Sequence, residues 1–315
     1  MASIPFENQF TSQIGGISKI ALGNSDDDWL RRIEYVGKQA ENWYSVVIPG
    51  FDSPANGSSL AADSVIPHLD VYAHALLLIS SAAEHLTFAT AEGFPISKDK
   101  ESGAEIRVIP VYPAAQHTVA RSAVMTASLA IWMLNPSARA ERQYHCLQFL
   151  WEDARLRMNA LVAMKPYIES NDFPITESSY NTNVATLQQQ QNSLKDIAKE
   201  QNFPMDKNGS PLPFKQTDVV AYACTQIQSS KGQPYDLLLW RMSSAAAHGM
   251  PFHALRNAVR IGDSSDGIRG VYSIEGSLQE VGPVLVGAYM LTHHALVLVQ
   301  KRSVNHLDSL KGTIG

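Results

Sequence analysis

Apolar residues recur every three or four positions along most of this chain, which is the period of an amphipathic α-helix. Pro, Ser, Thr and Asn stand just before these runs, and Gly or Pro follows most of them, as expected at helix ends. The first helix has Ser25 as its N-cap and three acidic residues in its first turn. We therefore predict eight helices, over residues 26–47, 67–92, 113–134, 136–169, 178–201, 217–229, 234–248 and 278–302.

Two segments depart from the helical period. Residues 95–112 carry charge and short apolar pairs, a pattern compatible with a long loop or an edge strand, and their conformation stays open. Between 257 and 274, two short β-compatible segments flank a turn-forming run of Asp, Ser and Gly. The prediction for the fold is an all-α, bundle-like multi-helix domain with a small β-hairpin insertion near the C-terminal third.

No repeat and no long linker divides the chain, so we expect a single helical domain over 1–315. Within it, N-terminal helices occupy 24–134, a long helix pair 135–202 and C-terminal helices 217–302. Asn135 and Pro136 are predicted to cap and begin the fourth helix, because Asn favours the N-cap and Pro the first helical position.

The stretch 281–299 holds no charged residue and raises the question of a membrane span. It contains Pro283, His293 and His294, and a span would place two imidazoles in hydrocarbon, so a buried core helix is favoured. The N-terminus lacks a basic region followed by an apolar run, and two cysteines are too few for a disulfide framework. A cytoplasmic protein without membrane contact is expected.

The 25 Lys and Arg residues against 30 Asp and Glu residues leave a net charge of −5, which excludes a global basic field for nucleic acid. Any contact with RNA must be local, and no DNA-binding motif is found. Phosphate-binding loops, dinucleotide-binding, kinase and Gly-x-Ser-x-Gly signatures are also missing. His74 and His85 lie three helical turns apart, too far for one ion, so neither a metal nor a cofactor is predicted.

Chemistry concentrates on the seventh predicted helix, which reads WRMSSAAAHG from Trp240 to Gly249. Arg241 and His248 are seven residues apart, two helical turns, so both face the same side with Ser244 between them. Gly249 suits the left-handed position that ends a helix, which places His248 in the last turn. The negative end of the helix dipole there favours an imidazolium, as in a general acid or a phosphate-binding group.

An Arg followed after six residues by His near a helix end resembles the R-x4–6-H signature of the HEPN superfamily of small helical proteins. Many HEPN proteins are metal-independent ribonucleases, in which Arg and His of paired protomers meet at a dimer cleft and the RNA 2′-hydroxyl attacks the adjacent phosphate. The resemblance implies Arg241 as phosphate clamp and His248 as acid or base. Ser244, on the same face, is the candidate auxiliary hydrogen-bond donor. A homodimer is expected, because the resembled family builds its site across a two-fold axis and the apolar last helix offers more hydrophobic surface than one partner helix covers. Met242 departs from the polar residue that often follows the Arg, and the chain is longer than a minimal unit. The wider layout, residues 121–150 followed by 241–249, resembles bacterial all-helical proteins, a similarity that implies no activity.

Positive charge continues downstream of this motif. Arg241 and the later arginines 256, 260 and 269 outnumber Asp263 and Asp266, the acidic residues of this span. His253, Arg256 and Arg260 are therefore predicted to line a groove that binds an anion such as the phosphate of RNA or of a nucleotide.

Several interpretations stay open. The protein is either an endoribonuclease or a non-catalytic helical domain that binds an anion, a nucleotide or another protein. In the plainest alternative, Arg241 pairs with a carboxylate and His248 caps the helix end through a buried hydrogen bond. Elsewhere, Arg121, Arg142 and Arg155 belong either to solvated helix faces of mixed charge or to a shared anion pocket.

Overall fold

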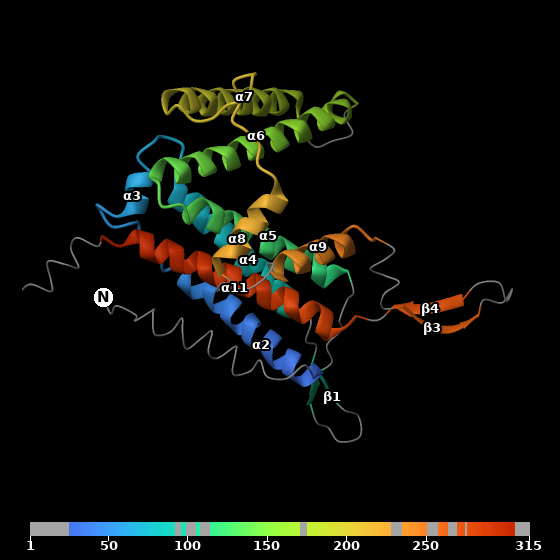
Figure 1. Cartoon of the computed structure of the whole chain (residues 1–315). Helices are drawn as coiled ribbons and strands as arrows, with labels where there is room; N and C mark the ends of the chain where they lie inside the picture. The colour runs from blue at the N-terminus through green and yellow to red at the C-terminus, as the bar shows by residue number, and fades with distance from the viewer. Residues whose placement is uncertain are drawn as a thin grey trace, which may run out of the picture. The chain divides into compact units, whose positions relative to one another are not determined.

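The computed structural model describes residues 25–91, 96–98, 105–107, 114–170, 175–227, 235–250, 258–263, 270–274 and 276–305 (Figure 1). Helices dominate these residues, so the all-α class is confirmed. They are α2 (Asp26–Asn42), the π-helix η1 (Trp43–Val47), α3 (Ser59–Asp63), α4 (Val71–Ala91), α5 (Ala115–Leu134), α6 (Arg139–Glu169), α7 (Glu177–Glu200), α8 (Gln216–Ile227), α9 (Tyr235–Ala247) and α11 (Leu278–Ser303).

Local capping explains where several helices begin. The Ser25 hydroxyl accepts the Asp28 backbone N–H at 3.3 Å, while the Asp28 carboxylate accepts the Ser25 backbone N–H at 3.2 Å, a complete capping box. The helix then changes to a π turn at Trp43, whereas the sequence predicted one regular helix to residue 47. At the other end of the chain, α11 begins directly after Ser277, as predicted.

The predicted first residues of two helices are wrong. The second predicted helix begins at Val71 and not at residue 67, because His68 has a left-handed backbone (φ 69°) and Asp70 instead accepts the Ala73 N–H at 3.1 Å. The short α3 before it was not predicted. Helix α6 follows Ala138 and not Asn135, so the Asn-Pro pair forms the corner before the helix.

Short strands occur in both non-helical segments. In the segment left open by the sequence, β1 (Ile96–Lys98) pairs antiparallel with β2 (Glu105–Arg107). Further on, β3 (Ala258–Asp263) pairs antiparallel with β4 (Gly270–Ile274), with a register shift between Arg260 and Gly262. The residues that join β3 to β4 lie outside the described ones, so the small hairpin stays a prediction.

Contacts group the chain into two compact units, each assembled from three separate segments. Unit 1 comprises residues 1–52, 76–131 and 220–297, and unit 2 comprises 53–75, 132–219 and 298–315. Helices α4, α5, α8 and α11 each have residues in both units. The single-domain organisation stays a prediction.

The core of unit 1 forms where α2 packs against α11 (Figure 1). Trp43 stacks on Tyr289 with ring centroids 4.9 Å apart, and Gly282 allows Trp29 to lie directly on the α11 backbone. Among the described helices, α11 alone is long and apolar enough by composition to cross a membrane, and 72% of its apolar window is buried inside the protein. That burial is typical of a core helix.

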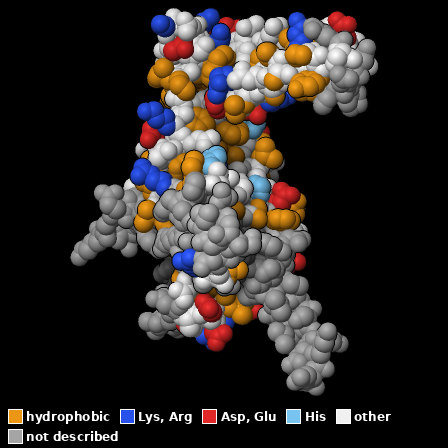
Figure 2. Space-filling model, turned by 90° about the vertical axis from the view of Figure 1, so that its right-hand side faces the viewer, with side chains coloured by type: hydrophobic (Ala, Val, Ile, Leu, Met, Phe, Trp, Pro, Cys, Tyr) orange, Lys and Arg blue, Asp and Glu red, His pale blue; other side chains and the backbone are white. Residues whose placement is uncertain are grey.

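Unit 2 is organised around α6. Helix α7 lies alongside α6, and Leu187, Leu194 and Ile197 belong to its buried face (Figure 1). Large hydrophobic side chains of α6 nevertheless remain exposed, including Leu156 and Val162. Figure 2 shows hydrophobic side chains on the surface of the upper part of the molecule. The base of α6 is fastened to α3 by a buried ion pair between Arg142 and Asp63.

Candidate functional site

Helix α9 is amphipathic: one face is buried, and the other carries the candidate site residues. Leu239, Trp240, Ser243 and Ala246 are buried on one side. On the opposite side Arg241 and His248 are exposed and Ser244 is half-buried. The seven-residue spacing predicted that these side chains share one face.

Side chains of α5 anchor the buried face of α9 within unit 1. The Ser243 hydroxyl and His117 Nδ1 are 3.1 Å apart, and both residues are buried. The Arg121 guanidinium lies over the Trp240 ring, 5.2 Å from its centroid. Sequence reasoning selected Ser244 and missed these contacts. The local signal for His117 as a core residue is the pair Ala120 and Val124, buried apolar residues that follow it on the same helix face. Because His117 and Ser243 are enclosed, their hydrogen bond positions α9 and does not face a substrate.

The C-terminus of α9 places His248 as the C-cap. Gly249 has a left-handed backbone (φ 62°), its N–H donates to the Ala246 carbonyl at 3.0 Å, and the Met250 N–H donates to the Ala245 carbonyl at 3.0 Å. These two bonds form a Schellman motif, which ends the helix and satisfies carbonyls of its last turn. The predicted helix end at Gly249 is confirmed. The exposed imidazole of His248 therefore stands at the end of a well-defined helix.

The described residues offer Arg241 and His248 no side-chain hydrogen bond and no ion pair. His248 is exposed, which contradicts a buried capping role, and Arg241 has no carboxylate partner among the described residues. Among the described residues, both side chains therefore face solvent.

The structure describes only one of the arginines that follow the motif in the predicted groove. Arg260 is exposed on β3. His253, Arg256 and Arg269 lie outside the described residues, so the groove they were predicted to form with α9 stays a prediction.

The three arginines of the alternative anion pocket each contact a partner within their own unit. Arg142 is buried and binds both carboxylate oxygens of Asp63, at 2.6 and 2.7 Å. Arg155 binds Glu152 within its own helix at 2.6 Å. Arg121 packs on Trp240, so each of these guanidinium groups has its own partner.

Within the described residues, no group of three or more His, Cys, Asp and Glu side chains lies close enough to hold a metal ion. The exposed face of α9 carries a cation, a hydroxyl and an imidazole, at Arg241, Ser244 and His248.

Comparisons of the whole chain with protein-family models, with curated proteins and with solved structures find no match.

Proposed function

We propose that this protein is a metal-independent endoribonuclease, and that the exposed face of α9 holds its RNA. The observation that supports this is the exposure of both Arg241 and His248 on one face of a helix whose other face is anchored in the core. A rigid helix holds its functional groups at a defined spacing, which catalysis requires. A cytoplasmic location and RNA as the partner remain parts of this proposal.

The proposed mechanism uses two copies of the chain, because Arg241 and His248 lie two turns apart on α9. Seven residues correspond to roughly 10 Å along the helix axis, too far for Arg241 and His248 of one chain to hold the same phosphate closely. In a two-fold dimer with antiparallel α9 helices, Arg241 of each copy lies beside His248 of the other. Leu238 and Met250, about half exposed near the motif, provide apolar surface for that contact.

The proposed reaction needs no metal. One His248 imidazole accepts the proton of an RNA 2′-hydroxyl, whose oxygen forms a bond to the adjacent phosphorus. The bond from phosphorus to the 5′-oxygen breaks, and this oxygen takes a proton from the imidazolium of the other copy. Arg241 stabilises the negative charge of the pentacoordinate phosphorus and Ser244 donates a hydrogen bond. Proton transfer through His248 is expected to contribute about 10²–10⁴-fold to the rate.

The alternative is a non-catalytic protein that binds an anion, a nucleotide or another protein with the same face. Leu238 is 52% exposed and Met250 is 50% exposed, and hydrophobic residues beside an exposed cation are typical of protein interfaces. In this alternative Arg241 supplies charge and His248 transfers no proton.

Incubation with total RNA in the presence of EDTA tests the nuclease. Wild-type protein should leave 2′,3′-cyclic phosphate ends, and His248→Ala and Arg241→Ala should abolish cleavage while circular dichroism shows a retained fold. Arg157→Ala, which removes an exposed cation of α6, is the matched control and should cleave normally.

Absence of cleavage by wild-type protein, or cleavage that persists in both α9 variants, would overturn the nuclease. Nucleotide binding without cleavage, lost in Arg241→Ala, would establish the non-catalytic alternative. A monomer by light scattering would contradict the two-copy mechanism.

A further inference from the structure

Helices α5 and α9 run antiparallel where they meet in unit 1 (Figure 1). His117 of α5 contacts Ser243 of α9, and one turn further along α5 the guanidinium of Arg121 lies over the ring of Trp240. The two partners on α9 thus occur in the opposite order from those on α5. This arrangement decides which side chains of α5 border the exposed face of α9.

Helix geometry places Arg121 on the same side of this helix pair as the α9 motif. Arg121 lies about 40° around α5 from His117, toward the exposed side of that helix. Ser244 lies about 40° around α9 from Trp240, toward the exposed Arg241. Because the same rotational sense points to the same side of two antiparallel helices, Arg121 borders the face that carries Arg241 and Ser244.

An aromatic ring holds the half-buried side chain of Arg121. The guanidinium carbon lies 5.2 Å from the centroid of the Trp240 ring, and Trp240 is 6% exposed. Arg121 Nε is buried without a hydrogen-bond partner, and among the described residues no carboxylate forms an ion pair with Arg121. A neutral ring orients a guanidinium without cancelling its charge. Arg121 is therefore a planar cation whose position is set by Trp240.

The plane of a guanidinium is a surface on which nucleobases stack. Because this group is planar and weakly hydrated, one of its faces can rest on an aromatic ring while the other contacts a second π system. Proteins that recognise single-stranded RNA stack unpaired bases on aromatic rings or Arg planes and hold the backbone with separate cations. Both kinds of group occur here, since Arg241 is exposed on the same side of the helix pair.

We propose that Arg121 stacks an unpaired nucleobase of the RNA whose phosphate Arg241 holds. This inference rests on the proposed function for RNA as the ligand, and it names the substrate class as single-stranded RNA. The Trp240 ring supports one face of the guanidinium, and the base lies against the other. Arg121 is then a binding residue that takes no part in proton transfer.

Fluorescence anisotropy with short 2′-O-methyl oligonucleotides tests the stacking. These strands lack the attacking hydroxyl, so the proposed reaction cannot cleave them. Wild-type protein should bind an oligoadenylate about tenfold more tightly than an abasic strand of the same length, because only the former offers bases to stack. A duplex that contains the oligoadenylate should also bind more weakly than the single strand, since its bases are already stacked and paired. Equal affinity for the adenylate and abasic strands, or binding of neither, would overturn the proposal.

Arg121→Lys separates the planar group from its charge. Lysine keeps a cation near Trp240 but has no plane on which a base can stack. The variant should bind the abasic strand as wild-type protein does, and its preference for the oligoadenylate should fall to about twofold or less. Arg157→Ala, which removes an exposed cation of α6, is the control and should keep the wild-type preference. An unchanged preference in Arg121→Lys, or equal weakening of both strands while circular dichroism shows a retained fold, would refute the stacking.

Stacking and cleavage can fail separately. If wild-type protein cleaves RNA and Arg121→Lys keeps its preference for the oligoadenylate, the nuclease stands and the stacking is wrong. If the preference depends on Arg121 and no RNA is cleaved, the stacking stands together with the non-catalytic alternative.

Discussion

The buried ion pair between α3 and α6 offers the sharpest stability prediction. We expect Asp63→Ala to remove both carboxylate oxygens from Arg142, whose side chain is 3% exposed. Nε and Nη2 then lose their partners at 2.6 and 2.7 Å, while Nη1 keeps the Pro136 and Ser137 carbonyls at 2.8 Å. The guanidinium remains buried with half of its hydrogen bonds and no counter-charge.

The magnitude follows from those two lost bonds. A hydrogen bond that involves a charged group contributes about 1.5–3 kcal/mol. Loss of both bonds agrees with the roughly 3–5 kcal/mol observed when one partner of a buried ion pair is removed. Asp63→Asn should cost less, because it keeps one acceptor and the side-chain shape. The double variant Asp63→Leu/Arg142→Met should recover much of the loss, since it removes the isolated charge as well.

Urea denaturation followed by circular dichroism measures these free energies of unfolding. Arg139→Ala is the matched control, because its side chain is 56% exposed and lies 3.9 Å from the same carboxylate, so it should cost less than about 1 kcal/mol. A loss below about 1 kcal/mol in Asp63→Ala, or a double variant less stable than either single variant, would refute the reasoning.

Three further predictions concern titration, close packing and thiol chemistry. Burial, and secondarily the adjacent imidazole, lowers the pKa of His293 from 6.5 to about 4, so the unfolded chain binds a proton that the folded protein does not. Stability should therefore fall as pH drops from 6.5 toward 4, and His293→Phe should flatten this slope in thermal denaturation; an unchanged slope would contradict the assignment. Gly282→Ala should destabilise the protein by about 1–3 kcal/mol, because its Cβ would lie 2.5 Å from the Trp29 ring, whereas Gly262→Ala, with open space around it, should not. Burial raises the pKa of the Cys146 thiol, so it should react with Ellman's reagent only after denaturation, and rapid reaction of the native protein at this residue would disprove its enclosure.

Local sequence determined the helical class and the helix ends whose capping residues lie within a few positions. The Ser25 capping box and the Schellman motif at Gly249 are examples, because donor and acceptor belong to the same short segment. The sequence also predicted that Arg241 and His248 share a face, because helix geometry alone sets the direction of two side chains seven residues apart.

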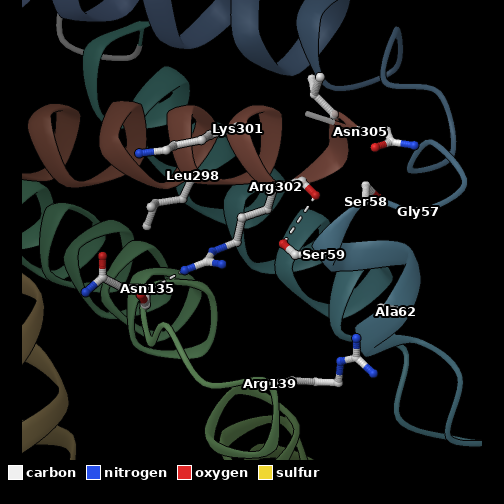
Figure 3. Close-up of a pocket in the computed structure, with 11 residues that line it drawn as sticks. Gly57, Ser58, Ser59, Ala62, Asn135, Arg139, Leu298, Lys301, Arg302 and Asn305 are labelled. Atoms are coloured by element: carbon white, nitrogen blue, oxygen red, sulfur yellow. Dashed lines mark hydrogen bonds between the residues drawn. The ribbon is translucent and has the colours of Figure 1, made fainter. Parts of the chain in front are cut away.

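Features whose interacting residues are far apart in sequence were decided only by the tertiary structure. Asp63 and Arg142 are 79 residues apart, and nothing in the charge pattern of α6 distinguishes the buried Arg142 from the exposed Arg139. Burial of a charge depends on the element that covers it, so the short α3, which sequence analysis missed, determines which arginine is enclosed. A cavity of about 600 Å³ lined by residues 57–62, 135–139 and 298–305 arises in the same way, because its three walls meet only when α3, the corner before α6 and the end of α11 pack together (Figure 3).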